Sequence, residues 1–346
     1  MLIVQQDYRL GNIPRPYVTN NEKDINMQIP DEIRKCVVFL AYKTTKGYQM
    51  VGTGFFCGID SDDKQFHFRY LVTAKHVLAK IQEQTKEDKI SVDNNIWVRV
   101  NKKDGNVDYI PVPFNLWLSH PDISISVDII ACLDILNPAI YDYLTIPYTM
   151  FATKDVMDKE YIGIGDEIFM TGLFINHYGK KRNIPIIRVG NIAALDEEPI
   201  HASKFGDMDA YLVETRSIGG LSGSPVFVHL SGSRISTDGN TTSMRSGHIF
   251  YLFGLMHGHW DLSAATEDVI TEDVVSKERV NMGIGIVVPF SKIWETLNQD
   301  IFKNNRESII LAEQKRRQPV EDSIKKVPAE FDRLIDKAIE CSPKDD

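Results

Sequence analysis

Short apolar runs separated by turn residues dominate the chain from about Ile33 onward. The runs are rich in Val, Ile, Phe and Tyr, and Gly, Asp, Asn or Lys residues stand between them. Runs of this length and composition are typical of β-strands. We predict strands at residues 36–42, 52–58, 66–73, 96–100, 127–133, 167–174, 184–190, 211–215, 225–230, 249–256 and 282–289.

Helical periodicity is scarce in the same region. A brief helical pattern occurs around residues 74–84, and the first clear amphipathic helix comes late, at Ser291–Phe302, where Ile293, Trp294, Leu297 and Ile301 can share one face. Many short strands without regular intervening helices favour antiparallel barrels or sandwiches over a parallel α/β sheet. The predicted fold class is therefore all-β.

The two ends of the chain differ from the middle in composition and in hydrophobic periodicity. Residues 1–30 hold three prolines and little periodicity, which predicts an irregular N-terminal arm. Residues 305–346 hold nine Lys or Arg and ten Asp or Glu residues, which sets them apart as a charged C-terminal tail. Part of the tail has helical spacing, so it is either a linker with a small docking helix or a solvated appendage.

Charge and cysteine content narrow the classes of partner and compartment. With 39 Lys or Arg and 48 Asp or Glu, the formal net charge is −9, which argues against nucleic acid and anionic membranes as partners.

The chain has no apolar run of about 18 residues, so no membrane span is expected. Its beginning lacks the pattern of a secretory signal. The four cysteines match no zinc or disulfide pattern, so we expect a cytoplasmic, reducing location; they are Cys36, Cys57, Cys132 and Cys341.

The segment Gly220-Leu221-Ser222-Gly223-Ser224-Pro225 is the most specific chemical motif. A serine flanked by glycines in a tight turn suits a nucleophile, because small neighbours admit a substrate backbone and free backbone N–H groups to face an oxyanion. The alternative is an ordinary Gly/Ser turn between two strands.

Two further segments each deliver one titratable residue at a strand end. His76 follows the strand in Y-L-V-T-A-K-H-V at residues 70–77, and Asp128 begins the apolar run V-D-I-I-A-C-L at residues 127–133. A lone histidine is more often structural, and Asp128 could be a half-exposed strand start. If Asp128 is buried, it needs a partner such as an imidazole N–H.

Taken together, the order His76, Asp128, Ser222 in an all-β chain resembles the trypsin-like (chymotrypsin-fold) serine peptidases, particularly bacterial members and the HtrA-type catalytic domain. The resemblance runs from about Gly52 to Leu297. Further matching segments are G-T-G-F-F at 52–56, I-G-D-E-I-F-M-T-G-L-F at 164–174, I-I-R-V-G-N-I-A at 186–193 and G-I-G-I-V-V-P-F-S-K-I at 283–293. The resemblance implies two antiparallel six-stranded β-barrels, at residues 31–150 and 151–304, the second ending in a helix.

The same resemblance implies a role for each site residue. Ser222 is expected as the nucleophile, His76 as general base and then acid, and Asp128 as the residue that orients the imidazole. The backbone N–H groups of Gly220 and Ser222 are expected to form the oxyanion hole. Asp122 is the alternative acid, but Asp128 alone begins the D-I-I-A-C-L run. The implied reaction is peptide-bond hydrolysis by a regulated intracellular endopeptidase that uses no cofactor and no metal. Its partners would be a protein substrate and a regulatory protein bound through the charged tail.

Three positions near the motifs depart from the family pattern. Val77 follows His76, so the disulfide that secreted members form there from the position of Cys57 cannot exist, which fits a reducing compartment. Leu221 stands where zymogen-activated members have an aspartate, so activation through that ion pair is excluded. Ser224 replaces a glycine, which we interpret as a packing change.

Candidate residues for the substrate pocket lie on two segments. His257, Gly258 and His259 belong to the strand expected to line the pocket, and Arg216 and Ser217 precede the serine closely enough to reach its base. An inward Arg216 would favour an acidic P1 residue, and an outward one a small or apolar P1 residue. The pair His257 and His259 lacks a third ligand at a recognisable spacing, so no metal site is predicted.

Two rival interpretations compete with the peptidase. An α/β-hydrolase with Ser222 as nucleophile, and His257 or His259 as its base, does not fit, because the motif lacks the G-x-S-x-G elbow and its flanks are strand–turn–strand. A peptidase-fold module without turnover, acting as a scaffold or sensor, is the remaining alternative.

Overall fold

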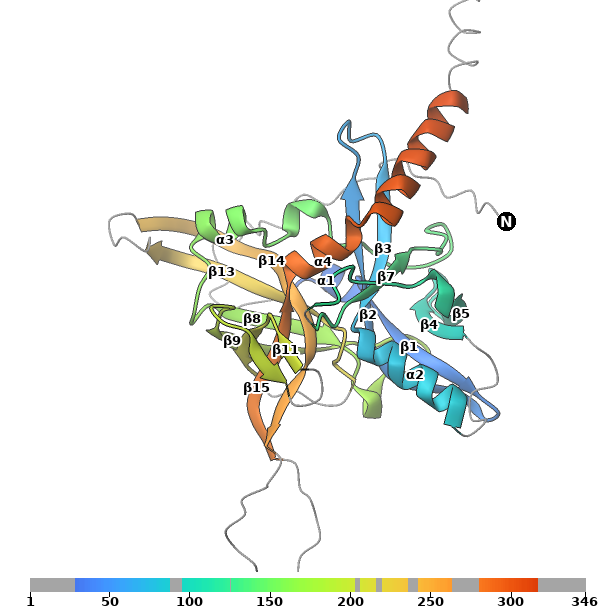
Figure 1. Ribbon diagram of the computed structural model, residues 1–346, viewed down its shortest axis with the longest axis horizontal. Coiled ribbons are helices and arrows are strands. Elements are labelled where there is room, and N and C mark those ends of the chain that lie inside the picture. The colour runs from blue at the N-terminus through green and yellow to red at the C-terminus, as the bar shows by residue number, and fades with distance from the viewer. Residues whose placement is uncertain are drawn as a thin grey trace, which may run out of the picture. The chain divides into compact units, whose positions relative to one another are not determined.

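The computed structural model describes residues 29–87, 95–124, 126–202, 206–215, 220–235, 242–262 and 280–316. The chain divides into two units, Met1–Leu297 and Asn298–Asp346. The first unit contains all the described strands. In the second unit, the described part is a helix over residues 300–316. Figure 1 shows the ribbon with its element labels.

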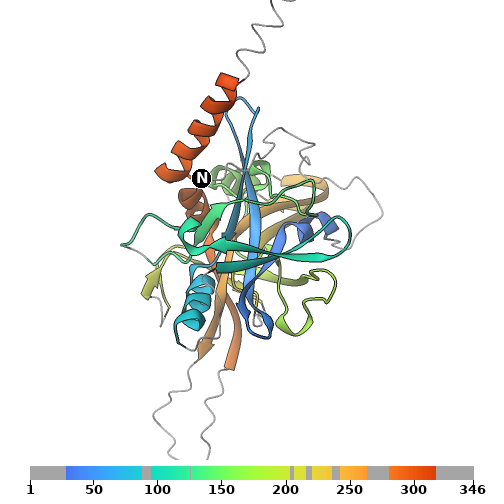
Figure 2. The ribbon, with the colours of Figure 1, turned by 90° about the vertical axis from the view of Figure 1, so that its right-hand side faces the viewer.

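The first half of the larger unit is an antiparallel sheet of seven strands in the order β5-β4-β1-β2-β3-β7-β6. Figure 2 shows these strands in blue to teal. The short helix α1 (Asp31–Lys35) precedes the sheet, and α2 (Lys75–Glu87) follows its third strand. The strands are β1 (Val37–Thr44), β2 (Gly47–Asp60), β3 (His67–Thr73), β4 (Asn95–Asn101), β5 (Val107–Pro113), β6 (Leu118–Ser119) and β7 (Ile130–Leu133).

The second half is a closed barrel of six strands in the order β12-β15-β14-β13-β8-β9. Helix α3 (Lys154–Glu160) leads into the barrel and α4 (Phe290–Leu297) follows its last strand. A separate hairpin pairs β10 (Ile200–Ala202) with β11 (Gly206–Met208). The barrel strands are β8 (Glu167–Gly172), β9 (Ile186–Ala194), β12 (Tyr211–Glu214), β13 (Pro225–Ile235), β14 (Thr242–Leu262) and β15 (Val280–Pro289).

This architecture confirms the all-β fold class. All eleven predicted strands are present, and the predicted closed six-stranded barrel is found in the second half. The first half differs in detail, because its strands form a seven-stranded sheet that includes two strands absent from the prediction, β5 and β6. The predicted helices at 74–84 and 291–302 correspond to α2 and α4, although α4 ends at Leu297.

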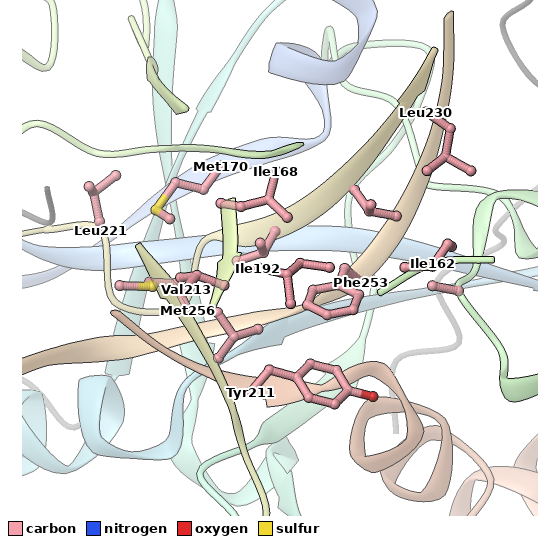
Figure 3. Close-up of a cluster of buried hydrophobic side chains, with 14 residues drawn as sticks. Ile162, Ile168, Met170, Ile192, Tyr211, Val213, Leu221, Leu230, Phe253 and Met256 are labelled. Carbon is pink, nitrogen blue, oxygen red and sulfur yellow. The ribbon is translucent and has the colours of Figure 1, made fainter. Parts of the chain in front are cut away.

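The core of the barrel fixes the segments that carry the site. Figure 3 shows fourteen buried side chains of this core, among them Leu221 and Met256. Within it the rings of Tyr211 and Phe253 stack with centroids 4.4 Å apart. Leu221 and Met256 are each fully buried and stand immediately before Ser222 and His257 in the chain. Because a close-packed core tolerates little displacement, these two residues hold the neighbouring polar residues at the barrel's edge.

The described cysteines are buried and unbridged. Cys36, Cys57 and Cys132 have free thiols, while Cys341 lies outside the described residues. Burial raises the pKa of the Cys36 thiol to about 12, and it also raises the pKa values of Cys57 and Cys132. The described helices include none that is both long enough and apolar enough to cross a membrane. Residues 1–28 of the predicted N-terminal arm and residues 317–346 of the predicted tail also lie outside the described part of the chain.

Candidate active site

The register of the first sheet brings Asp128 to the start of the segment that carries His76. Thr73, the last residue of β3, pairs with Ile130 of β7, so Asp128 stands beside the first residues of α2. The backbone N–H of Lys75 donates to the Asp128 carbonyl at 3.4 Å. His76 is the second residue of α2, and therefore has one of the backbone N–H groups that a helix leaves without an internal acceptor.

The Asp128 carboxylate accepts two hydrogen bonds from His76. Oδ1 accepts the backbone N–H at 2.8 Å, and Oδ2 accepts the ring Nδ1–H at 2.6 Å. The first bond caps α2 with a negative charge at its N-terminus, which is favourable for the helix. The second fixes the tautomer, because a neutral imidazole that carries its proton on Nδ1 has an unprotonated Nε2, which is a base.

The charge on Asp128 is stabilised despite its burial. The Asp128 side chain is 3% exposed. Burial by itself would raise the pKa of this carboxyl, but the adjacent His76 and the hydrogen bonds from His257 and His76 outweigh that effect and hold the pKa below its usual range. Asp128 is therefore an anion that can stabilise a positive imidazole in its immediate neighbourhood.

The Ser222 loop (residues 220–224) forms hydrogen bonds with both halves of the fold. On the side of the first sheet, the Thr53 N–H donates to the Ser222 carbonyl at 3.0 Å and Thr53 Oγ1 donates to the Gly220 carbonyl at 2.8 Å. On the barrel side, the Gly223 N–H donates to the Met256 carbonyl at 2.8 Å and the Met256 N–H donates to the Ser224 carbonyl at 2.9 Å. The motif G-T-G-F-F on β2 thus supplies a hydroxyl, Thr53, that the sequence interpretation did not assign to the site.

Glycines allow the Ser222 loop to approach the segment that carries His76. Gly223 has φ +84°, and a Cβ on it would lie 2.2 Å from the Thr53 carbonyl oxygen and 2.4 Å from Thr73 Oγ1. A Cβ on Gly52 would meet both Val77, the residue after His76, and the Ser222 carbonyl. These contacts bring the backbone of Ser222 and the start of α2 to the same side of one glycine of β2.

Two backbone donors of the loop remain available for a ligand. Gly220 adopts φ +101°, a conformation that glycine adopts readily. Among the hydrogen bonds between described residues, the N–H groups of Gly220 and Ser222 have no acceptor, whereas those of Gly223 and Ser224 are used within the fold. These are the two N–H groups that the sequence interpretation expects at an oxyanion hole, beside a half-buried serine.

His257 lies against the acid of the site. Its Nδ1 is 2.5 Å from Asp128 Oδ2, and its ring centroid is 5.1 Å from that of His76. The side chain is 6% exposed. The sequence pattern identified His257 as a candidate of the pocket wall, and its contact with Asp128 joins residues 129 positions apart that no local motif connects.

The cluster of His76, Asp128 and His257 has the donor types of a metal site, with ligand atoms within 4.8 Å of one another. Its spacing is that of hydrogen bonds. The two Nδ1 atoms lie 2.6 and 2.5 Å from Asp128 Oδ2, whereas two ligands of a tetrahedral zinc stand about 3.3 Å apart. The residues would have to separate to hold a metal, so their present arrangement does not fit one.

The remaining candidates occupy other places. Asp122 is exposed, and its carboxylate accepts from the backbone and hydroxyl of Ser124 at 2.8 and 2.6 Å. Gly258 and His259 are partly exposed on β14 next to His257. Arg216 and Ser217 lie outside the described residues.

Comparisons with known proteins find similar folds and no close relative. No family model and no curated protein matches the chain. Many solved structures match it in fold, and three of them follow. The MamO protease domain from Magnetospirillum magneticum, in its apo form, is 14% identical over 78% of this chain and 98% of that one, with a TM-score of 0.42.

The other two are Deg5 and an inactive Ser343Ala mutant of Rv3671c from M. tuberculosis H37Rv. Deg5 is 10% identical over 76% of this chain and 88% of that one, with a TM-score of 0.40. Rv3671c is 17% identical over 82% of this chain and 94% of that one, with a TM-score of 0.37. At such identities and scores, the function has to be argued from the geometry of the site itself. In fold, the chain is similar to trypsin-like serine protease domains.

Proposed function

We propose that this protein is a serine endopeptidase whose catalytic residues are His76, Asp128 and Ser222. The observation that carries the proposal is the bond from His76 Nδ1 to the buried, ionised Asp128, which leaves Nε2 of the ring as a base. The Ser222 loop supports it, because its glycines bring the serine to the same strand, β2, that the start of α2 contacts.

The proposed reaction has two halves. Ser222 Oγ attacks the scissile carbonyl while His76 Nε2 takes the hydroxyl proton, and the resulting oxyanion is bound by the N–H groups of Gly220 and Ser222. Collapse of this intermediate breaks the C–N bond, and His76 returns the proton to the departing amine. Water, deprotonated by His76, then attacks the acyl-enzyme, and Ser222 regains its proton as the acid product leaves.

A covalent probe tests this proposal directly. A fluorophosphonate reacts with a serine that an adjacent base activates, so the folded protein is expected to be labelled at Ser222 and the Ser222→Ala variant is not. Ser231, an exposed serine on β13, provides the matched control, and Ser231→Ala is expected to label like the parent protein. Absence of labelling in the folded protein, tested alone and with candidate substrates, would contradict the peptidase and favour a module without turnover.

The natural substrate is proposed only as a class. A peptide or protein chain is the substrate that the site chemistry suits, and we propose that the protein works inside the cell and is regulated through its charged tail. The free, buried thiols of Cys36, Cys57 and Cys132 are compatible with a reducing compartment. Cleavage of a substrate library by the purified protein would define the P1 preference.

A further inference from the structure

Two imidazoles share one oxygen of the catalytic acid. Oδ2 of Asp128 lies 2.6 Å from Nδ1 of His76 and 2.5 Å from Nδ1 of His257, and the two rings are inclined by 70°. All three side chains are buried or nearly so, with exposures of 11% for His76, 6% for His257 and 3% for Asp128. A buried carboxylate requires donors, and here the carboxylate has three N–H groups.

His257 is also coupled to the Ser222 loop through the backbone of the residue before it. Met256, the preceding residue, exchanges two hydrogen bonds with the loop, one accepted from Gly223 and one donated to Ser224. The Met256 side chain is buried in the barrel core. The position of His257 is therefore set by the segment that holds Ser222, and its ring extends from there to Asp128.

We propose that His257 is a positioning residue for His76, holding Asp128 at a fixed place relative to the Ser222 loop by donating Nδ1–H to Oδ2. This inference rests on the proposed peptidase function. Because both rings bind the same oxygen, a displacement of the carboxylate toward one ring lengthens its bond to the other. His257 thus limits the rotation of the Asp128 carboxylate, and the position of that carboxylate sets the direction of Nε2 in His76.

One variant of His257 that keeps a hydrogen-bond donor and one that lacks any donor test this role. His257→Asn keeps an N–H donor near the place of Nδ1, whereas His257→Leu fills similar space without any donor. Loss of a hydrogen bond to a charged group is expected to lower kcat by about 10- to 100-fold in His257→Leu. KM should stay within about twofold, since the hydrogen bond that His257→Leu removes is made to Asp128, and His257→Asn should recover most of kcat.

His229 offers a matched control. It is another buried histidine of the same barrel, on β13, and its Nδ1 lies 2.5 Å from Glu167 Oε2, outside the proposed site. His229→Leu removes a contact between a buried imidazole and a partly exposed carboxylate, and it is expected to leave kcat and KM unchanged at temperatures where the protein remains folded. Equal kcat losses in His229→Leu and His257→Leu would overturn the positioning role, as would a His257→Asn variant as slow as His257→Leu.

A magnetic-resonance measurement tests the positioning role of His257 without measuring turnover. In the Ser222→Ala protein, the Nδ1–H protons of His76 and His257 should give separate far-downfield nitrogen-correlated resonances, assigned by the loss of each in its own variant. His257→Asn should remove one and shift that of His76, while His229→Leu should leave the His76 resonance in place. An unshifted His76 resonance in His257→Asn would overturn the inference even for an active peptidase. A shift in Ser222→Ala, together with a parent protein that no fluorophosphonate labels, would support the shared carboxylate and refute the proposed function alone.

Discussion

The two oxygens of Asp128 perform different tasks at the scale of single residues. Oδ1 caps α2 through the backbone of His76, and Oδ2 binds the imidazoles of His76 and His257. A change at this one carboxylate is therefore expected to affect both the orientation of a base and the start of a helix.

Replacement of Asp128 by asparagine should abolish most turnover. The amide would favour the wrong tautomer of His76, and in a well-studied peptidase of this mechanism the same change lowers kcat by about 10⁴-fold. Steady-state hydrolysis of a peptide ester or amide measures the effect. Asp122→Asn is the control, because Asp122 is exposed and contacts Ser124, and it should retain kcat within about twofold. An equal loss in both variants would contradict the choice of Asp128.

The stability that Asp128 contributes should depend on pH with a defined sign. Its folded-state pKa lies below that of an unfolded aspartate, near 3.9, so the folded protein binds fewer protons between the two values. The contribution, on the order of 2 kcal/mol, is therefore complete above about pH 5 and falls as the pH drops below about 4. Urea unfolding of the parent protein and Asp128→Asn should show a difference that narrows in acid. A difference that widens there would contradict the assignment.

At this scale the sequence could predict the site residues that are marked by their immediate neighbours in the chain. His76 and Asp128 could be selected because each stands at the end of an apolar run, and the structure places them in contact. The contacts of His257 and Thr53 were beyond reach, since each joins segments whose meeting depends on how the two halves pack. In G-T-G-F-F, the position of Thr53 between two glycines was the one sequence feature that could have indicated a role for its hydroxyl at the site.

At the scale of elements, the Ser222 turn depends on glycine at position 223. Gly223→Ala should reduce fluorophosphonate labelling by about 10-fold or more, because its Cβ would collide with the Thr53 carbonyl in addition to the strain of φ +84°. Gly105→Ala separates the two effects, since Gly105 has φ +89° and a Cβ added there would meet nothing within 4 Å. That variant should lose about 1 kcal/mol of stability and no labelling. Normal labelling of Gly223→Ala would show that the turn tolerates displacement.

The strands were predictable from their apolar runs, with instructive exceptions. β5 carries Asp108, Pro111 and Pro113, and it escaped the pattern because an edge strand tolerates prolines and needs fewer apolar residues. β6 has two residues, too few to show any alternation. The closure of the second barrel and the open order of the first sheet depend on strand pairing between distant segments, which an apolar pattern alone does not specify.

At the scale of the whole larger unit, Arg99 joins the two halves. This residue of β4 is 1% exposed, and its guanidinium donates to the carbonyls of Gly179 and Lys180 and to Asn183 Oδ1 on the segment between β8 and β9. Asn183 returns a hydrogen bond to the Arg99 carbonyl at 2.7 Å. A buried cation held by carbonyl oxygens is costly to disturb, because those oxygens would lose their donors.

Arg99→Met should therefore destabilise the fold by more than about 2 kcal/mol and expose residues 178–183 to limited proteolysis. Urea unfolding and mapping of the first cleavage site would measure both effects. Arg182→Met tests the surface counterpart on the same segment, where a 47% exposed side chain pairs with Asp142. Its change should stay within about 0.5 kcal/mol, and a similar loss in both variants would argue against the buried contact as the cause.

The contacts of the Ser222 loop with β2 on one side and β14 on the other mean that the two halves are not interchangeable modules. A hybrid that combined this barrel with a first half lacking Thr53 and Gly52 would lose the hydroxyl that donates to the Gly220 carbonyl and the close approach of β2 to the Ser222 carbonyl. Recombination at the junction between the halves should therefore yield folded but inactive proteins, and the two halves are expected to change together in evolution.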